Sequence, residues 1–176
     1  FVRYSTVPVF ERTEEASLFR VPHTVMLDNA KFKFWYGGGS SYIDGTNKTL
    51  PVYNIRYLES NSLINIPDKG IEVLDTIDEE HRVGRPNVLK DNELFKMYFG
   101  FGSDKKPYQL GYAESRDGKN WSRDDLKLGL PLSSSGWDSE MMAYPCVVKV
   151  NNKTYMFYNG NEYGKYGFGY AELVQE

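Results

Sequence analysis

One pattern occurs three times along the chain: a proline, an alternating strand, a polar turn and a second strand rich in aromatic residues. The first strands begin at Pro22, Pro86 and Pro145, about 60 residues apart. The second strands are expected at 32–37, 95–100 and 155–160. Asn-containing turns between them suit hairpins, because Asn tolerates a positive φ. Similar units at a regular spacing indicate a fold built by repetition.

Further strands complete each unit. A third strand is expected at 53–60, 109–115 and 167–172. After the middle one, the Asp-Gly turn at 117–118 leads to a short outer strand anchored by Trp121. In the first unit, Ile71–Ile77 is interpreted as the outer strand, with a short helical turn as the alternative. Three to four strands on this scale are typical of a propeller blade, so we predict an all-β fold with three four-stranded blades.

The expected blade boundaries are 18–80, 81–139 and 140–176, with 1–17 as a linker or the outer strand of a preceding blade. Three blades do not close a ring, because the terminal blades would expose apolar faces and open edges. We therefore expect either that further blades precede Phe1 or that the open edges associate with another copy of the chain. The strand-like character of residues 1–12 favours the first alternative.

Charge and cysteine content exclude several classes of protein. The chain has a net charge of -3, and its 21 Lys and Arg residues form no basic stripe, so nucleic acid is not an expected partner. No apolar run approaches the roughly 18 residues of a membrane span, so no membrane partner is expected. Cys146 is the single cysteine, which fits a reducing, cytoplasmic compartment.

The blade prolines and the Asp-Gly-x-x-Trp turn at 117–121 resemble the five-bladed β-propeller superfamily of arabinanases, β-xylosidases, levansucrases, invertases and mannoside phosphorylases. A bacterial group of uncharacterised glycosidase-like propellers, linked to surface-polysaccharide genes, looks most similar at segments 84–86, 111–115, 136–141 and 158–164. The resemblance covers nearly the whole chain, as the last three of five blades. It implies a carbohydrate ligand.

The chain departs from that superfamily at the general acid. The hydrolases typically have a Glu two residues before the blade proline, and here Arg20, Gly84 and Ala143 occupy those positions. Glu140, five residues before Pro145, is the nearest replacement. The base and the auxiliary Asp of the superfamily would lie on earlier blades. No loop has the dense oxygen-ligand spacing of a calcium site, so neither metal nor other cofactor is expected.

Carboxylates near the blade prolines are the catalytic candidates. Asp138 and Glu140 are two residues apart, so in an extended chain both side chains point to one face. Glycoside hydrolysis needs two carboxyl groups roughly 5–9.5 Å apart. Glu80 of the neighbouring blade could complete such a pair with Glu140, and Asp138 is the third candidate. The alternative for these carboxylates is strand-turn capping or an ion pair with an arginine.

Ligands of such propellers bind on the axis, at one end of the inner strands, so residues near the blade prolines are the binding candidates. An Arg fork can hold an anionic sugar or phosphate, His81 is the titrating candidate, and Asn or aromatic side chains suit sugar hydroxyls and ring faces. Inter-blade salt bridges and ordinary turn chemistry are the alternatives, and His23 is expected to be structural. The substrate-binding candidates are Arg85, His81, Arg20, Tyr144, Asn159, Asn161 and Tyr163.

The sequence thus predicts a glycosidase-like propeller acting on a glycan, as a hydrolase or a phosphorylase. The alternative is a non-catalytic glycan-binding or assembly module, because the superfamily's acid is missing from its usual position.

Overall fold

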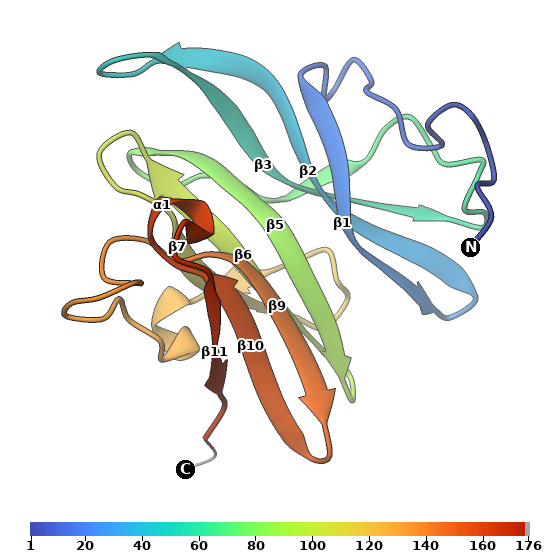
Figure 1. Ribbon diagram of the computed structural model, residues 1–176. Coiled ribbons are helices and arrows are strands. Elements are labelled where there is room, and N and C mark those ends of the chain that lie inside the picture. Colours follow the sequence, from blue (N-terminus) through green and yellow to red (C-terminus); the bar gives the residue numbers. More distant parts are fainter. Residues whose placement is uncertain (175–176) are drawn as a thin grey trace.

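The computed structural model describes residues 1–174, and almost all of its regular structure is β (Figure 1). Two short helical turns accompany the strands: the 3-10 turn η1 at Asp125–Leu128 and α1 at Asn161–Gly164. The strands are β1 Phe19–Asp28, β2 Lys31–Asp44, β3 Thr49–Ser60, β4 Ile71–Leu74, β5 Glu80–Asp91, β6 Leu94–Ser103, β7 Gln109–Ser115, β8 Ser122–Arg123, β9 Ala143–Val150, β10 Lys153–Asn159 and β11 Phe168–Glu172. The all-β prediction is confirmed.

The strands form two open sheets. The larger has the order β1-β2-β3-β5-β6-β7-β8, with β4 also paired to β3, and the smaller has the order β11-β10-β9. Neighbouring strands within each repeat unit are antiparallel, as expected for successive hairpins. A single parallel pair, Tyr53 with Arg82, joins β3 of the first unit to β5 of the second. Backbone pairing therefore joins the first two units at this one point, and side-chain contacts make the remaining connections between them.

The units differ in strand number. The first has four strands, and its outer strand β4 confirms the strand interpretation of Ile71–Ile77 over the helical alternative. The second also has four, although β8 is only two residues long. The third has three strands within residues 1–174, so the expected fourth strand is not seen there.

Residues 1–17, which we interpreted as a linker or as the outer strand of a preceding blade, contain no strand in the structure. Residues 1–18 contain only an isolated bridge between Thr13 and Ala16. Side-chain bonds attach this segment to the first sheet instead: Glu15 accepts hydrogen bonds from the Tyr36 hydroxyl at 2.7 Å and from Arg56 Nη1 at 3.2 Å. Because no neighbouring strand pairs with its backbone, the segment stays irregular.

Each first strand is interrupted at its proline. The register between β1 and β2 shifts between Pro22 and Thr24, which leaves His23 as the extra residue. The equivalent shifts place Arg85 and Pro86 opposite one residue of β6, and Tyr144 and Pro145 opposite one residue of β10. Such bulges redirect side chains locally. Each unit therefore has a bulge beside its proline, with the extra residue after the proline in the first unit and the positive-φ residue before it in the other two.

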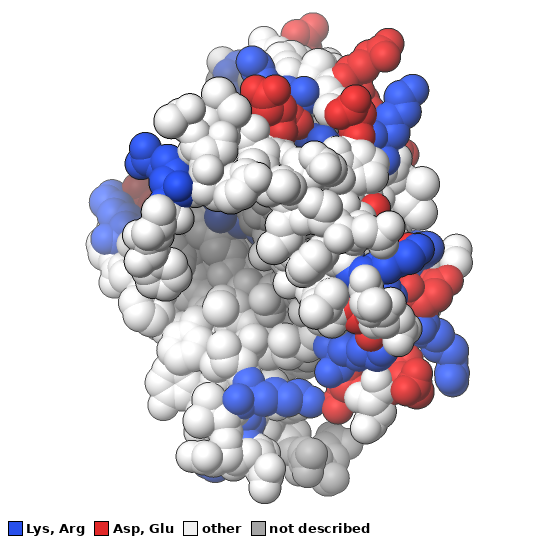
Figure 2. Space-filling view, turned by 90° about the vertical axis from the view of Figure 1, so that its right-hand side faces the viewer, with Lys and Arg blue, Asp and Glu red and all other residues white. Residues whose placement is uncertain are grey.

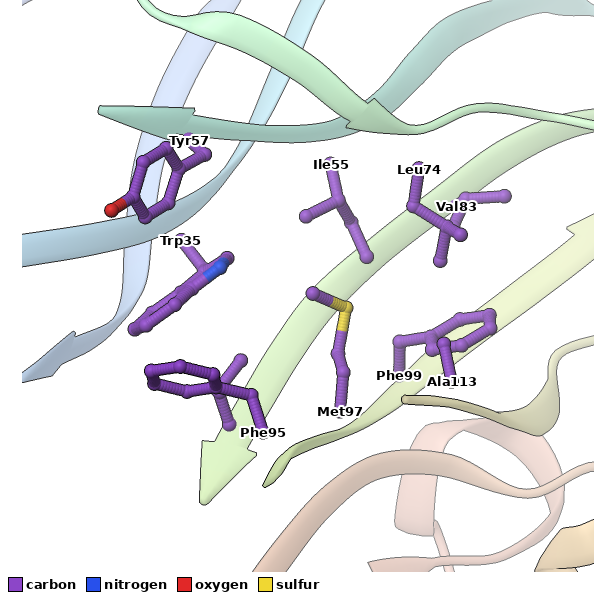
Figure 3. Close-up of a cluster of buried hydrophobic side chains, with 10 residues drawn as sticks. Trp35, Ile55, Tyr57, Leu74, Val83, Phe95, Met97, Phe99 and Ala113 are labelled. Atoms are coloured by element: carbon purple, nitrogen blue, oxygen red, sulfur yellow. The ribbon is translucent and has the colours of Figure 1, made fainter. Parts of the chain in front are cut away.

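The main core lies between the first and second units (Figure 3). Trp35 and Tyr57 from the first unit meet Phe95 and Met97 from the second, and all four are almost completely buried. The buried Trp35 indole donates its Nε1 hydrogen to the Gly118 carbonyl oxygen at 2.9 Å. This carbonyl belongs to the Asp-Gly turn recognised in the sequence, and the turn therefore fastens the two units together.

Charges of both signs are mixed on the face of the molecule shown in Figure 2. In Figure 2, Lys and Arg side chains alternate with Asp and Glu, mostly at the top and right of the view, beside a hollow bordered largely by uncharged residues. Such a mixed distribution agrees with the absence of a basic stripe in the sequence. None of the helical turns within residues 1–174 has the length and apolar composition needed to cross a membrane.

Candidate functional site

All three repeat units contribute to one cavity of about 420 Å³, which we call the central cavity. Its walls are mainly aromatic and cationic. Its lining residues are Phe19, Val21, His23, Gly37, Lys48, Thr49, Leu50, Pro51 and Tyr53 from the first unit, His81, Arg82, Gly84, Arg85 and Tyr108 from the second, and Tyr144 and Tyr163 from the third. A concave site where several elements converge is the usual form of a small-molecule site.

The bulges aim one residue of each unit at this cavity. His23, Arg85 and Tyr144 all lie at the register shifts and all line the cavity. Arg85 and Tyr144 have φ angles of 54° and 63°, in the left-handed region that side chains other than glycine rarely adopt. Residues held in that region cluster at functional sites, because their conformation is unfavourable and requires support from the surrounding fold.

Tyrosine rings form one wall. Tyr144 and Tyr163 stack with ring centres 6.1 Å apart, and Tyr108 meets Tyr163 edge-on at 6.0 Å. The Arg85 guanidinium lies over the Tyr144 ring, with Cζ 3.8 Å from the ring centre. The Tyr53 and Tyr108 hydroxyls are hydrogen-bonded to each other. Burial raises the pKa of Tyr53 to about 12, so this phenol stays protonated and can donate near neutral pH.

The buried face of the cavity carries histidine and arginine. His81 is only 2% exposed, and its Nδ1 lies 2.9 Å from the Pro51 carbonyl oxygen. A carbonyl only accepts, so Nδ1 carries the hydrogen, and Nε2 is an acceptor in the neutral ring. Within residues 1–174, Nε2 has no hydrogen-bond partner. Arg82 Cζ lies 4.3 Å from the Tyr108 ring centre, and its Nε is likewise buried without a partner among those residues.

His23 is neutral at physiological pH. Burial, followed by the positive charge of Arg85, lowers its pKa to about 4. The lowered pKa does not test the structural role that we expected for His23. The residue does line the central cavity.

The three predicted catalytic carboxylates lie outside the central cavity. Glu80 accepts hydrogen bonds from Arg123 Nη2 at 2.7 Å and Nη1 at 2.9 Å. Asp138 is buried and accepts the Tyr158 hydroxyl at 2.8 Å. Glu140 is exposed, and its amide donates to Asn161 Oδ1 at 2.9 Å. Glu80 therefore lies in an ion pair of the second unit, and the structure does not place it with Glu140 in one cavity. Their catalytic roles stay predictions.

Four of the seven predicted binding residues meet in the central cavity: His81, Arg85, Tyr144 and Tyr163. The other three make contacts elsewhere. Arg20 Nη2 donates to the Pro67 carbonyl oxygen at 2.8 Å, and its guanidinium covers the ring of Phe10. Asn159 Nδ2 donates to the Tyr163 carbonyl oxygen at 2.9 Å. Asn161 accepts the amides of residues 140 and 141 and so holds the loop before β9.

Sequence reasoning missed Tyr53, Tyr108, Arg82 and Lys48 as candidates. A signal for the two tyrosines was present: each lies four residues before the tyrosine in the middle of the third strand, at Tyr57 and Tyr112. In the third unit the same spacing gives Tyr166 before Tyr170. Tyr166 is 68% exposed and does not line the cavity. The repeat therefore predicts that these three tyrosines are equivalent in sequence. Whether each one lines the cavity depends on the fold of its own unit.

No protein family model matches the chain. The chain is 31% identical over 174 residues to the uncharacterised protein Rv1502 of Mycobacterium tuberculosis strain ATCC 25618 / H37Rv, and equally identical to MT1551 of strain CDC 1551 / Oshkosh. The match covers 98% of this chain and 57% of each relative. The chain therefore spans little more than half the length of the curated relatives it matches.

Solved structures with a similar backbone include glycoside hydrolases. A protein described as a glycoside hydrolase superposes with a TM-score of 0.71 at 18% identity, over 97% of this chain and 51% of that one. The family 117 glycoside hydrolase Zg3597 of Zobellia galactanivorans gives 0.69 at 15%, over 87% and 51%. The Bombyx mori family 32 β-fructofuranosidase gives 0.59 at 18%, over 86% and 33%. The chain thus has the fold of glycoside hydrolase propellers.

Proposed function

We propose that the chain binds a carbohydrate in the central cavity, as the ligand-holding part of a carbohydrate-active β-propeller. The observation that carries this proposal is the convergence of His23, Arg85 and Tyr144, one from the bulge of each unit, on a single cavity. Each bulge directs a different side chain to the cavity, and at Arg85 and Tyr144 this requires an unfavourable positive φ. A shared ligand is a reason for a fold to retain such a conformation.

The chemistry of the walls suits a sugar. The stacked pair Tyr144 and Tyr163 offers a flat apolar surface for the C–H face of a pyranose or furanose ring. Of the paired Tyr53 and Tyr108 hydroxyls, one hydrogen is left to donate to a sugar hydroxyl, and the Nε2 of His81 supplies an acceptor. Pockets that combine aromatic walls with a few polar groups bind small molecules in a defined orientation.

The surrounding architecture supports the same proposal. We propose that 18–80, 81–139 and 140–176 are three blades of a five-bladed ring. Three of five blades amount to about three-fifths of a propeller, and the chain spans 57% of the relatives' length. A family 32 β-fructofuranosidase of this fold has been solved in complex with sucrose. For the present chain, a glycan ligand is part of the proposal.

Hydrolysis is the second candidate function, and the exposed carboxylate of Glu140 favours it. Glu80 and Asp138 are engaged by Arg123 and Tyr158, whereas within residues 1–174 the Glu140 carboxylate makes no hydrogen bond or ion pair. Glu140 is therefore the member of the predicted set that we propose as the general acid.

Binding is tested by titration calorimetry of the 176-residue chain with a panel of mono- and oligosaccharides. Replacing Tyr144 with Ala is expected to weaken binding at least about tenfold, because the ring provides both the stacking surface and the support of Arg85. Tyr166→Ala is the matched control, since Tyr166 holds the equivalent of the Tyr108 position but lies outside the cavity. Absence of saccharide binding, or equal weakening by both substitutions, contradicts the proposal.

Hydrolysis is tested separately, by measuring sugar release from aryl glycosides and oligosaccharides. If Glu140 is the general acid, Glu140→Gln lowers turnover by about 10²- to 10⁴-fold and leaves saccharide affinity unchanged. Glu162→Gln, which removes another exposed carboxylate of the third unit, is the control. Turnover that survives Glu140→Gln rules out this role for Glu140, and binding without any sugar release leaves the first proposal alone.

A further inference from the structure

We propose that the sugar bound in the central cavity carries an acidic group, a carboxylate or a phosphate, which is held by the guanidinium groups of Arg85 and Arg82. This inference rests on the proposed function and specifies its substrate class.

The charge of the cavity differs from that of the chain. The whole chain has 24 acidic against 21 basic residues, yet the lining contains Lys48, Arg82 and Arg85 and, within residues 1–174, no Asp or Glu. Hydrogen bonds from Thr46 hold the pKa of the nearby Asp104 carboxyl below its usual range, with a smaller contribution from the positive charge of Lys48. Its carboxylate already accepts the Thr46 amide and hydroxyl at 2.6 Å each. The cavity therefore presents positive charge to a ligand.

Arg85 is placed to bind an anion with the edge of its guanidinium. One flat face of this group lies on the Tyr144 ring, with Cζ 3.8 Å from the ring centre. Stacking uses the π face and leaves the in-plane N–H groups available. Within residues 1–174 these groups make no hydrogen bond or ion pair, although the side chain lines the cavity. The N–H fork matches two oxygens of a carboxylate or a phosphate.

Arg82 offers a second, more buried set of donors. Its Nη2 bonds weakly to the carbonyl oxygens of Ser103 and Lys106, at 3.3 and 3.4 Å, and these contacts fix the group over Tyr108. Its Nε is buried and has no partner within residues 1–174. Buried polar atoms in native proteins almost always have a hydrogen-bond partner. An oxygen atom of the bound ligand would provide the partner that Arg82 Nε lacks.

His81 provides an independent indication of a ligand. The side chain is 2% exposed, it lines the cavity, and its Nε2 has no partner among the described residues. Because Nδ1 donates to the Pro51 carbonyl, Nε2 of the neutral ring accepts a hydrogen bond, and a sugar hydroxyl is a suitable donor. The arginines therefore suit the acidic group, and His81 with the tyrosine wall suits the sugar that carries it.

The test compares matched ligands by titration calorimetry of the 176-residue chain at one fixed salt concentration. The ligands are glucose, glucuronate and glucose 6-phosphate, the corresponding galactose series, and inorganic phosphate. At least one acidic sugar is expected to bind about tenfold or more tightly than both its neutral parent and inorganic phosphate. Whether the uronate or the sugar phosphate shows this preference identifies the acidic group.

Arg85→Gln is expected to reduce the ratio of acidic to neutral affinity to about one, with the neutral sugar little affected. Arg116→Gln is the matched control: it removes an exposed arginine outside the cavity and should keep the ratio. Melting followed by circular dichroism verifies that both variants fold. If Arg85→Gln does not fold, Arg82→Gln replaces it in the same comparison.

Each of the other outcomes rejects a specific part of the proposal. Equal affinity for acidic and neutral sugars, or an unchanged ratio in Arg85→Gln, rejects the acidic group and leaves sugar binding intact. Inorganic phosphate that binds as tightly as the sugar phosphate rejects a contribution of the sugar ring. If no ligand of the panel and no neutral saccharide binds, the proposed function fails together with this inference.

Discussion

The Arg85 guanidinium lies 3.8 Å above the centre of the Tyr144 ring, and the two residues hold equivalent positions in successive repeat units. Both precede the proline of their strand, both have a positive φ, and both line the central cavity. The contact therefore joins two copies of one backbone feature across the boundary between units. It also holds the guanidinium at the wall of the cavity in which we propose a ligand.

The left-handed backbone at Arg85 predicts an unusual order of stability. Arg85→Gly should be more stable than Arg85→Ala by about 1 kcal/mol, because glycine adopts a φ of 54° without the steric cost that a Cβ atom brings. At Arg116, which is not among the positive-φ residues of the described chain, alanine should be at least as stable as glycine. Urea unfolding of the four variants measures the two differences. The same order at both positions contradicts the prediction.

The ion pair of Glu80 predicts a strong effect of its partner. Arg123→Met should lower the free energy of unfolding by about 3 kcal/mol, because it leaves the Glu80 carboxylate, about one-tenth exposed, without its partner. Lys105→Met removes the partner of the adjacent Glu79, whose pair is mostly exposed, and should cost less than about 1 kcal/mol. Denaturant titration compares the variants. A loss below 1 kcal/mol for Arg123→Met would show that Glu80 does not depend on this pair.

The lowered pKa of His23 predicts a pH dependence of stability. Between its folded pKa of about 4 and its ordinary value of 6.5, the unfolded chain binds a proton at His23 that the folded chain does not. The free energy of unfolding should therefore fall as the pH is lowered, by about 1 kcal/mol from pH 7.0 to 5.5 through this residue. His23→Gln should lack this part of the decrease. Urea unfolding at the two pH values measures it, and an identical decrease in both proteins contradicts the assignment.

The turn at Gly118 predicts a difference between two glycines of similar conformation. Gly118 and Gly129 have φ angles of 77° and 67°, but a Cβ at Gly118 would lie 2.9 Å from Trp35 Cζ2, whereas none of the described atoms lies within 4 Å at Gly129. Gly118→Ala should therefore cost about 1–3 kcal/mol more than Gly129→Ala, since the buried indole has no room to shift. Thermal or urea unfolding tests this, and equal losses would mean that Trp35 moves freely.

Periodicity in the sequence was sufficient to predict the first three strands of each unit. Hairpins after Pro22, Pro86 and Pro145, and the turn that fastens Trp35, follow from local patterns of alternation and turn residues. The absence of a strand in residues 1–18 could not be predicted, because strand formation depends on a neighbouring strand, and the side-chain bonds of Glu15 are contacts between distant residues.

The site was predicted only in part, for a related reason. Arg85 and Tyr144 were binding candidates because they lie next to a blade proline, and both line the central cavity. This criterion works for them because the bulge beside the proline is a local feature of the strand. The same criterion placed Glu80 and Arg20 with them, although neither lines the cavity. Alternation and bulges together decide which face of a strand a residue occupies, and a register shift of one residue reverses that face. The sequence does not show where the register shifts.

The threefold bulge has a consequence for how such a site can change. Arg85 and Tyr144 lie directly before the proline of their strand, and His23 lies directly after its proline, so all three are at a bulge but differ in size, charge and hydrogen-bonding capacity. Duplicating a unit therefore duplicates an inward-facing position, and each copy can diverge in chemistry while the strand pairing around it persists. In this arrangement the scaffold is common to the three units, and ligand preference can be altered one unit at a time.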